Sequence, residues 1–208
     1  MTERPLLACG PAEASQALLE GLLVRLGLTG TLVSGKDPHG RPTLCLDGQP
    51  LAFSLSRAGD HSHESGARLL TKVARSPLCP PCGVQAKPGH HICALAMALK
   101  GRVGVDLVAP FRGDPGPLEA LFHLSEREWI RELRGEARGL ALTRCWAAKE
   151  ALLKALGLGL GFGPDAVELA PGRDGSLRVA RIAGQEAEGW HLELSSVEDL
   201  ILALAWAE

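Results

Sequence analysis

The order of hydrophobic periodicities repeats along the chain, and this repeat restricts the fold more than any other feature. Residues 14–28 carry leucines at helical spacing, and short apolar runs typical of strands follow them. Residues 143–156 again predict a helix, and short apolar runs follow once more. The runs predicted as strands are 43–46, 51–56, 92–99 and 103–108, then 166–169, 177–182, 190–195 and 200–207. We therefore expect an α+β protein built from a duplicated unit.

Two further patterns refine this plan. The last runs of the two halves, 93–98 and 202–207, are similar Ala/Leu-rich sequences, as expected of a duplication. Between the halves, Ser125 and Glu128 form a capping-box pattern inside a hydrophobic staple of Leu124 and Trp129. This pattern predicts a helix that starts there and ends near Gly135.

Composition limits the class of protein. With 208 residues, 46% of them hydrophobic, the chain can bury a substantial core. A net charge of −2 argues against wholesale nucleic-acid binding. The longest apolar runs fall far short of the ~20 residues that span a bilayer, and the first residues do not form a secretory signal. We expect a cytoplasmic monomer with no membrane or nucleic-acid partner, whose six cysteines stay reduced.

Residues 60–89 do not fit the repeat and separate two runs that would otherwise form a hairpin, so they are interpreted as an insertion. Cys79 and Cys82 could form half of a zinc site that nearby histidines complete, although a second cysteine pair at ligand spacing is absent. The alternative is a flexible loop with incidental cysteine and histidine. Both interpretations remain open at this stage.

The residues with the strongest chemical implication are two carboxylates. Asp106 ends an apolar strand, where an ionised group must be paired, hydrogen-bonded or metal-bound. Glu150 lies on the charged face of the helix 143–156, between Lys149 and Lys154. Two hard oxygen ligands flanked by lysines suit Mg²⁺ bound together with a phosphorylated substrate. The simpler alternatives are a turn at the strand end and an exposed helix face with a Glu150–Lys154 pair.

These residues resemble the two-part signature of the 4′-phosphopantetheinyl transferases. The signature is Gly104-Val105-Asp106, then Trp146-x-x-Lys149-Glu150-Ala151-x-x-Lys154 and Gly157-Leu158-Gly159-Leu160. Gly40-Arg41-Pro42 and Phe53-Ser54-Leu55-Ser56 resemble elements of the two-lobed, surfactin-synthetase-activating members. The resemblance implies two pseudo-twofold-related lobes, each a helix packed on a small, mostly antiparallel sheet, with coenzyme A in the cleft between them. The lobes would be residues 1–108, including the insertion, and 109–208.

The resemblance also implies an activity. Such an enzyme transfers 4′-phosphopantetheine from coenzyme A to a serine of an acyl or peptidyl carrier protein and releases adenosine 3′,5′-bisphosphate. Asp106 and Glu150 would hold Mg²⁺, and Lys149 and Lys154 would face the diphosphate. Glu150, directly or through a metal-bound water, would receive the serine proton, so Glu150 and Lys154 are the expected catalytic residues.

The remaining implied contacts lie in the first half. Arg41 would bind the 3′-phosphate of coenzyme A, Ser56 would add a hydroxyl, and Arg57 stands where the family has His. Val108 stands where a third acidic ligand is common. These departures keep a second hypothesis open, a non-catalytic coenzyme A or carrier-binding paralogue. The lead-in before the first helix is short, so we expect the first lobe to lack a strand or to borrow one.

The carrier protein would need a docking surface. Acyl carrier proteins are acidic, and four arginines near the inter-lobe helix could attract them, namely Arg127, Arg131, Arg134 and Arg138. The alternative is a solvated helix face on which neighbouring glutamates balance these charges. The sequence does not decide between them.

Overall fold

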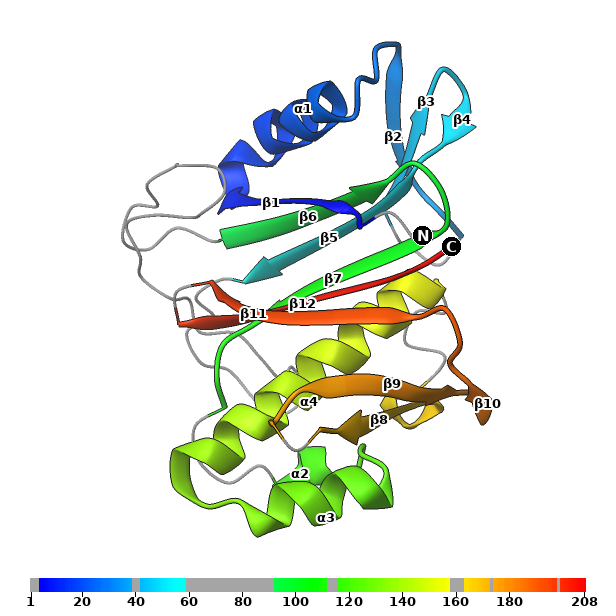
Figure 1. Ribbon diagram of the computed structural model, residues 1–208. Helices are drawn as coiled ribbons and strands as arrows, with labels where there is room; N and C mark the ends of the chain where they lie inside the picture. Colours follow the sequence, from blue (N-terminus) through cyan, green and yellow to red (C-terminus); the bar gives the residue numbers. More distant parts are fainter. Residues whose placement is uncertain are drawn as a thin grey trace.

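The computed structural model describes residues 4–38, 42–58, 92–111, 116–157, 163–172, 174–197 and 199–208 (Figure 1). The fold is α+β with small antiparallel sheets, as predicted from the sequence. In chain order the elements are β1 (Leu6–Pro11), η1 (Ala12–Ala14), α1 (Ser15–Arg25), β2 (Leu32–Lys36), β3 (Pro42–Leu46), β4 (Gln49–Pro50), β5 (Ala52–Ala58), β6 (Ile92–Ala98), β7 (Arg102–Val108), α2 (Gly116–Glu119), α3 (Leu124–Glu132), α4 (Gly135–Leu156), η3 (Pro164–Ala166), β8 (Val167–Pro171), β9 (Leu177–Ile182), β10 (Gln185–Glu186), β11 (His191–Val197) and β12 (Leu200–Ala207).

Two three-stranded antiparallel sheets form the centre of the molecule (Figure 1). Their strand orders are β1-β6-β5 and β11-β12-β7. One apolar cluster joins the inner faces of the sheets and includes Ile92, Leu107 and Leu204. A second cluster packs α1 on the outer face of the first sheet, and a third packs α4 on the outer face of the second. Successive residues of each central strand therefore point alternately into the layer between the sheets and into the layer beneath a helix.

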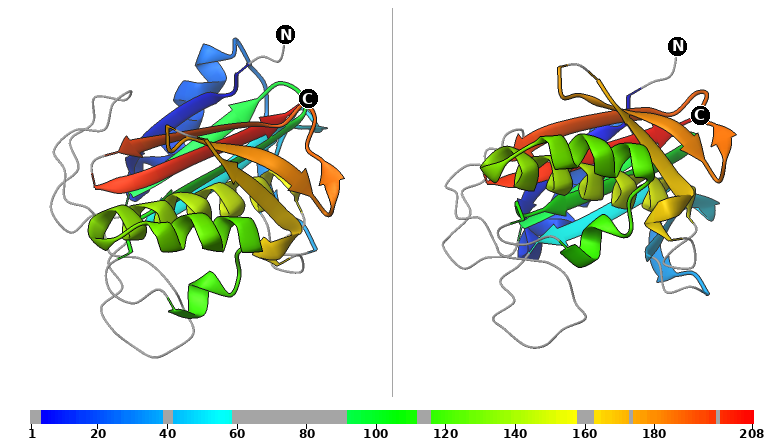
Figure 2. Two further views of the ribbon diagram at one scale, coloured as in Figure 1. Left: turned by 60° about the horizontal axis from the view of Figure 1, so that its bottom comes forward. Right: turned by 90° about the horizontal axis from the view of Figure 1, so that it is seen from below.

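The predicted duplication is visible in the order of the elements. A helix, a small three-stranded sheet and a long hairpin follow one another twice, as α1, β2-β3-β4 and β5-β6, then as α4, β8-β9-β10 and β11-β12. The similar runs 93–98 and 202–207 lie in the central strands β6 and β12. The β8–β9 hairpin lies beside α4 in the turned views of Figure 2.

Strand β1 corrects one expectation. The short lead-in does not leave the first sheet incomplete, because Leu6–Pro11 pairs with β6 along its whole length. In the duplicated order, β1 corresponds to β7, which pairs with β12 in the same way. The predicted lobe boundary after residue 108 stays a prediction, and this correspondence would favour a boundary before β7.

The predicted inter-lobe helix exists as α3, but a different pair of residues caps it. His123 is the N-cap, and its backbone N–H donates to Glu126 Oε2 at 2.8 Å. Ser125 and Glu128 therefore lie inside the helix, and Leu124 is exposed rather than part of a staple. The capping pattern therefore predicted a helix that exists, but it placed the N-cap two residues too late in the sequence. Among the described residues, no helix combines the length and apolar character needed to cross a membrane.

Helix α4 begins at Gly135, two turns before the predicted start at residue 143. Glycines at 135 and 139 weaken helix propensity there, but Ala141 and Leu142 are buried in the core against the second sheet. Packing therefore extends the helix beyond its sequence signal. Its C-terminus matches the prediction, since Gly157 adopts a left-handed conformation with φ 75° and ends the helix.

Candidate active site

The two central sheets meet where β5 and β7 run side by side, and two serines join them. The backbone N–H of Val105 donates to Ser54 Oγ at 3.0 Å, and that of Leu107 donates to Ser56 Oγ at 3.2 Å. Both serines are buried. Side-chain oxygens thus satisfy backbone donors that a neighbouring strand would otherwise pair. This junction fixes the position of Asp106, which lies between the two bonded residues.

Asp106 has the partners that its burial requires. Its side chain points from β7 toward α4 and is 9% exposed. Oδ1 accepts a hydrogen bond from Ser56 Oγ at 3.0 Å and an ion-paired hydrogen bond from Lys154 Nζ at 2.6 Å. Lys154 also donates to the Val105 carbonyl at 3.1 Å. The structure therefore brings together three of the predicted site residues, Ser56, Asp106 and Lys154.

Glu150 completes this cluster electrostatically. It lies one helical turn before Lys154 on α4 and is partly buried. Desolvation raises the pKa of its carboxyl, the nearby Asp106 charge raises it further, and Lys154 acts in the opposite direction. Two carboxylates that repel each other beside one ammonium group form a site that can accept either a proton or a cation.

Gly104 sets how closely α4 approaches β7, and the sequence analysis assigned it no role of its own. A Cβ at this position would lie 1.9 Å from the Ala151 carbonyl oxygen and 2.6 Å from the Ala155 nitrogen. Only glycine allows this contact between backbones. The helix turn that carries Glu150 and Lys154 is thereby held against the strand that carries Asp106.

The donor set of this cluster fits a magnesium ion. Mg²⁺ commonly retains waters and binds one or two carboxylates, which Asp106 and Glu150 can supply. The described residues contain no group of three Asp, Glu, His or Cys side chains placed to hold a metal. Val108, at the position of the expected third ligand, is 2% exposed in the core beneath α4. A metal ion here would therefore depend on water for most of its coordination.

Lys149 does not join the cluster. Its ammonium group pairs with Glu126 at 2.9 Å, and both side chains are completely buried. It also donates to the carbonyls of Pro164, at 3.0 Å, and Val167, and lies 5.7 Å from the centre of the Phe122 ring. Burial lowers the pKa of Lys149, and the Glu126 charge opposes that shift. The structure thus commits the Lys149 ammonium to an internal network, away from Asp106 and Lys154.

Glu126 is a residue that the sequence analysis missed. Its Oε2 accepts the N-cap hydrogen bond of α3, and its Oε1 accepts the backbone N–H of Leu169 at 2.7 Å in addition to the Lys149 ion pair. The network therefore connects α3, α4 and β8. Glu126 is the third residue of α3, a position where a glutamate often caps the helix. The sequence prediction missed it because Ser125 and Glu128 match the same capping pattern two residues later.

The phosphate-binding residues predicted in the first half are only partly described. Arg57 is exposed on β5, on the strand face opposite Ser54 and Ser56. Arg41 lies outside the described residues, as do Leu158, Gly159 and the insertion with Cys79 and Cys82. The predicted roles of Arg41 and the zinc alternative therefore remain predictions.

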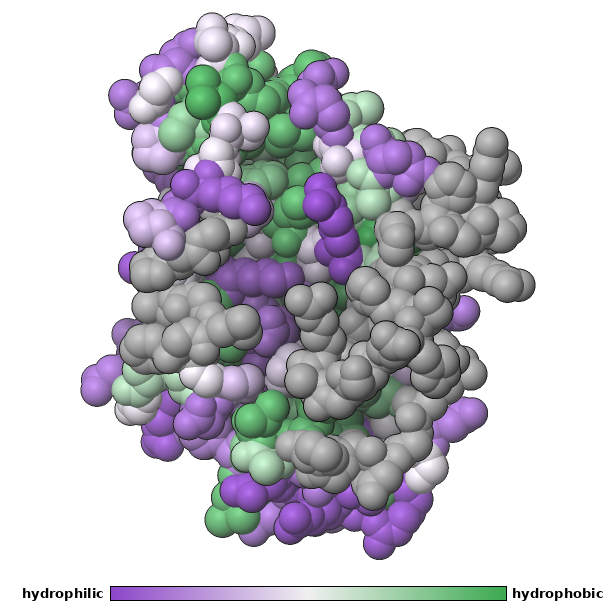
Figure 3. Space-filling view, turned by 180° about the vertical axis from the view of Figure 1, so that it is seen from behind, coloured by the Kyte–Doolittle hydropathy of each residue, from purple (hydrophilic) through white to green (hydrophobic). Residues whose placement is uncertain are grey.

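The four arginines proposed for carrier docking are largely engaged within the chain. Arg138 pairs with Glu119, and Arg131 approaches the same carboxylate at 3.5 Å. Arg134 donates to the Leu133 carbonyl at 3.1 Å. Part of this positive charge is thus balanced, but by Glu119 of α2 and not by Glu126, Glu128, Glu132 or Glu136, the glutamates that the alternative named. Figure 3 shows hydrophilic residues at the lower end of the molecule and a further hydrophilic area at mid-height on its back, between apolar areas above and below.

The fold and this cluster define a class: an α+β protein with two carboxylates and a lysine at the contact between a strand and a helix. The model of a family described as the 4′-phosphopantetheinyl transferase superfamily matches residues 102–205, half of the chain. This chain belongs to that superfamily. The match begins with β7 and contains the Asp106, Glu150 and Lys154 positions.

Solved structures give partial matches. A holo-[acyl-carrier-protein] synthase from Thermotoga maritima is 26% identical, with a TM-score of 0.43, over 51% of this chain and 62% of that one. The complex of the Chronobacterium ammoniagenes enzyme ACPS with CoA is 25% identical, with a TM-score of 0.42, over 52% of this chain and 97% of that one. No curated protein sequence matches this chain significantly.

Proposed function

We propose that this protein transfers 4′-phosphopantetheine from coenzyme A to a serine hydroxyl of an acyl or peptidyl carrier protein. The observation that carries the proposal is the cluster of Asp106, Glu150 and Lys154, three signature positions that meet in a member of this superfamily. Membership of a superfamily described by this transfer supports the choice of reaction.

The reaction exchanges one phosphorus–oxygen bond for another. The serine oxygen forms a bond to the β-phosphorus of coenzyme A, and the bond from that phosphorus to the bridging oxygen breaks. The bridging oxygen leaves with adenosine 3′,5′-bisphosphate, and the serine proton passes to a base. Such transfers depend mainly on positioning and on neutralisation of the phosphate charge, so no covalent enzyme intermediate is needed.

Lys154 is suited to hold the diphosphate. Its side chain is about one third exposed, and its ammonium group bonds to both Asp106 and a strand carbonyl, so the group is oriented before substrate arrives. A charge-assisted hydrogen bond to a phosphate oxygen contributes ~1.5–3 kcal/mol where water is excluded. Lys154 therefore binds coenzyme A and stabilises the charge that develops on the bridging oxygen.

Glu150 is suited to receive the serine proton. A general base works best when its pKa approaches the working pH, and both burial and Asp106 shift the pKa of Glu150 upward. Its partial exposure leaves it accessible to an incoming hydroxyl. Asp106, paired with Lys154, remains the more buried and fixed of the two carboxylates.

Asp106 and Glu150 would also hold Mg²⁺, which supplies positive charge to the diphosphate when it is bound. Chelation then separates the two hypotheses for this protein. A transferase loses turnover without the metal, whereas a non-catalytic paralogue retains coenzyme A binding and shows no turnover under either condition. The buried Val108 is the observation that keeps this second candidate open.

The experiment incubates the purified protein with coenzyme A, Mg²⁺ and candidate acyl and peptidyl carriers, and weighs each carrier by mass spectrometry. A carrier that gains one phosphopantetheine identifies both activity and partner. Asp106→Ala and Glu150→Ala should each abolish transfer without unfolding the protein. Glu20→Ala, which removes an exposed glutamate from α1, is the matched control and should leave transfer unchanged. Near-normal turnover in either site variant would refute the assignment.

Arg57, with Arg41, remains our candidate for binding the 3′-phosphate of coenzyme A. Arg57 is exposed on the strand that also carries Ser56, so it is accessible to a ligand. Wild-type protein should then prefer coenzyme A to dephospho-coenzyme A, and Arg57→Ala should reduce that preference roughly tenfold, mainly in KM. An unchanged preference would remove Arg57 from the site.

A further inference from the structure

Two serines of β5 make the same kind of contact with β7, and this similarity allows their roles to be separated. Ser54 Oγ accepts the backbone N–H of Val105 at 3.0 Å, and Ser56 Oγ accepts that of Leu107 at 3.2 Å. The serines are 7% and 6% exposed. As supports for β7 they are therefore matched in chemistry, in length of the hydrogen bond and in burial.

Ser56 makes one contact that Ser54 does not. Its Oγ donates to Asp106 Oδ1 at 3.0 Å. A serine hydroxyl carries a single hydrogen, and here that hydrogen is committed to Asp106. The phosphate groups of coenzyme A are hydrogen-bond acceptors and need donors. Ser56 could therefore donate to a phosphate only by releasing Asp106.

The two donors that reach Asp106 share one of its oxygens. Lys154 Nζ donates to Oδ1 at 2.6 Å, to the same atom that accepts from Ser56. The donors come from different elements, β5 and α4, and rotation of the carboxylate about its Cβ–Cγ bond would break both hydrogen bonds. Among the described residues, no hydrogen bond reaches Oδ2. Oδ2 is therefore the oxygen left available for a ligand.

An oriented carboxylate suits the cation for which this cluster has the donors. Mg²⁺ demands a near-ideal octahedral arrangement of oxygen ligands, so a carboxylate that is already fixed loses less freedom on binding it. Hydrogen bonds to a ligating carboxylate typically raise metal affinity about 10–100-fold. Val108 is buried at the position of the expected third ligand, so the orientation of the remaining carboxylates matters more.

We propose that Ser56 is a positioning residue, which holds Asp106 with Oδ2 free for the cation and does not itself bind a phosphate of coenzyme A. Ser54 supports β7 without this role. The proposal rests on the proposed function, because the cation at Asp106 and Glu150 is part of that function.

Manganese binding tests the proposal without any carrier protein. Mn²⁺ prefers the same oxygen ligands as Mg²⁺, and electron paramagnetic resonance counts the Mn²⁺ that stays free in the presence of the full chain and coenzyme A. A protein-free titration with coenzyme A is the blank. Ser56→Ala should weaken Mn²⁺ binding at least about tenfold, and Ser54→Ala much less. Ser56→Thr keeps the hydroxyl and should recover most of the affinity.

Two further measurements separate positioning from support of the fold. Each alanine variant leaves one backbone N–H of β7 without its side-chain acceptor, so both should lose similar thermal stability. In Ser56→Ala, the Mg²⁺ concentration that gives half-maximal carrier modification should rise about tenfold, with little change in KM for coenzyme A at saturating Mg²⁺. Ser56→Cys, which keeps the size of the side chain but is a weaker donor, should lie between serine and alanine.

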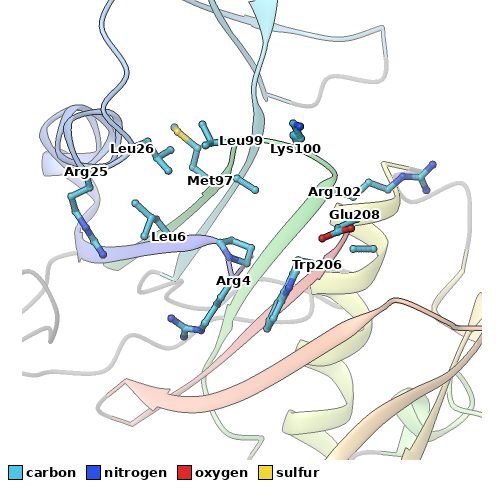
Figure 4. A pocket seen from close by; sticks show the side chains of 13 residues that line it. Arg4, Leu6, Arg25, Leu26, Met97, Leu99, Lys100, Arg102, Trp206 and Glu208 are labelled. Atoms are coloured by element: carbon cyan, nitrogen blue, oxygen red, sulfur yellow. The ribbon is translucent and has the colours of Figure 1, made fainter. Parts of the chain in front are cut away.

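Glu208→Gln controls for weak metal binding at exposed carboxylates. Glu208 is exposed and lines a separate pocket of about 670 Å³, near the turn from β6 to β7 and the end of β12 (Figure 4). Neither serine nor Asp106 belongs to that lining, so this variant should bind Mn²⁺ like the wild type.

Three results would overturn the proposal: equal losses of Mn²⁺ affinity in the two alanine variants, unchanged Mn²⁺ affinity with a raised KM for coenzyme A in Ser56→Ala, or no Mn²⁺ binding by the wild type. The second of these would return Ser56 to the phosphate-binding role. The expected pattern of Mn²⁺ binding without modification of any carrier would refute the proposed function and leave the role of Ser56 standing.

Discussion

Replacing Gly104 with alanine tests whether the contact between α4 and β7 positions the active site. The added Cβ would lie 1.9 Å from the Ala151 carbonyl oxygen, whereas real Cβ contacts essentially never fall below 3.0 Å. The helix and the strand must therefore separate by about 1.1 Å, the difference between these two values. Both close atoms belong to the α4 backbone, so side-chain rotation cannot relieve the clash.

Two effects of different size follow from this separation. Overpacking of this kind costs about 1–3 kcal/mol of folding free energy, which lowers Tm by roughly 2–4 °C per kcal/mol in a protein of this size. The Lys154–Asp106 distance, now 2.6 Å, would also lengthen beyond a hydrogen bond unless the lysine follows. A displacement of ~1 Å near the chemistry can reduce the rate about a hundredfold. We expect the loss of turnover to exceed what the loss of stability explains.

The assay compares carrier modification rates at a temperature well below Tm with thermal unfolding of the same samples. Gly21→Ala is the matched control, because Gly21 lies on α1 and a Cβ added there would meet no atom within 4 Å. That substitution should stabilise the helix by about 0.5–1 kcal/mol and leave transfer unchanged. A Gly104→Ala protein with wild-type Tm and turnover would show that this backbone contact does not position the site.

Two further predictions concern the charged residues of α4. Lys149→Met should destabilise the fold by about 3–5 kcal/mol in urea titrations, because it leaves Glu126 buried and unpaired. Adding Glu126→Gln should recover part of this loss. Wild-type stability together with a raised KM for coenzyme A would instead support the phosphate-binding role predicted for Lys149. Because the pKa of Glu150 is raised by folding, the folded state binds a proton at this carboxyl more tightly than the unfolded state does. The free energy of unfolding should therefore fall as pH rises from the pKa of the unfolded state to that of the folded state. Carbon-detected NMR titration should show the pKa of Glu150 falling in Asp106→Asn and rising in Lys154→Met, and shifts in the same direction would contradict the electrostatic account.

The sequence predicted the regular elements well where their signals are local and strong. The predicted strands 177–182 and 200–207 match β9 and β12 residue for residue, and α1 lies within the predicted helix. Strands β1 and β2 and the short β4 and β10 were missed. β2 is mostly exposed, and β4 and β10 span two residues each, so they lack the alternation on which the prediction depends.

The sequence by itself determined which chemical groups are available: a carboxylate on an apolar strand, and a glutamate and two lysines on one helix. Only the tertiary structure decided which of these groups meet. The Lys154 side chain pairs with Asp106, whereas the Lys149 side chain is buried in the core. There it forms an ion pair with Glu126 of α3, which replaces water as the partner of the lysine charge. Helical spacing fixes the direction in which each side chain leaves α4, but it does not say which segment of the chain packs against that side of the helix. The partner of a buried charge is a property of the fold, and here it separates two lysines of one motif.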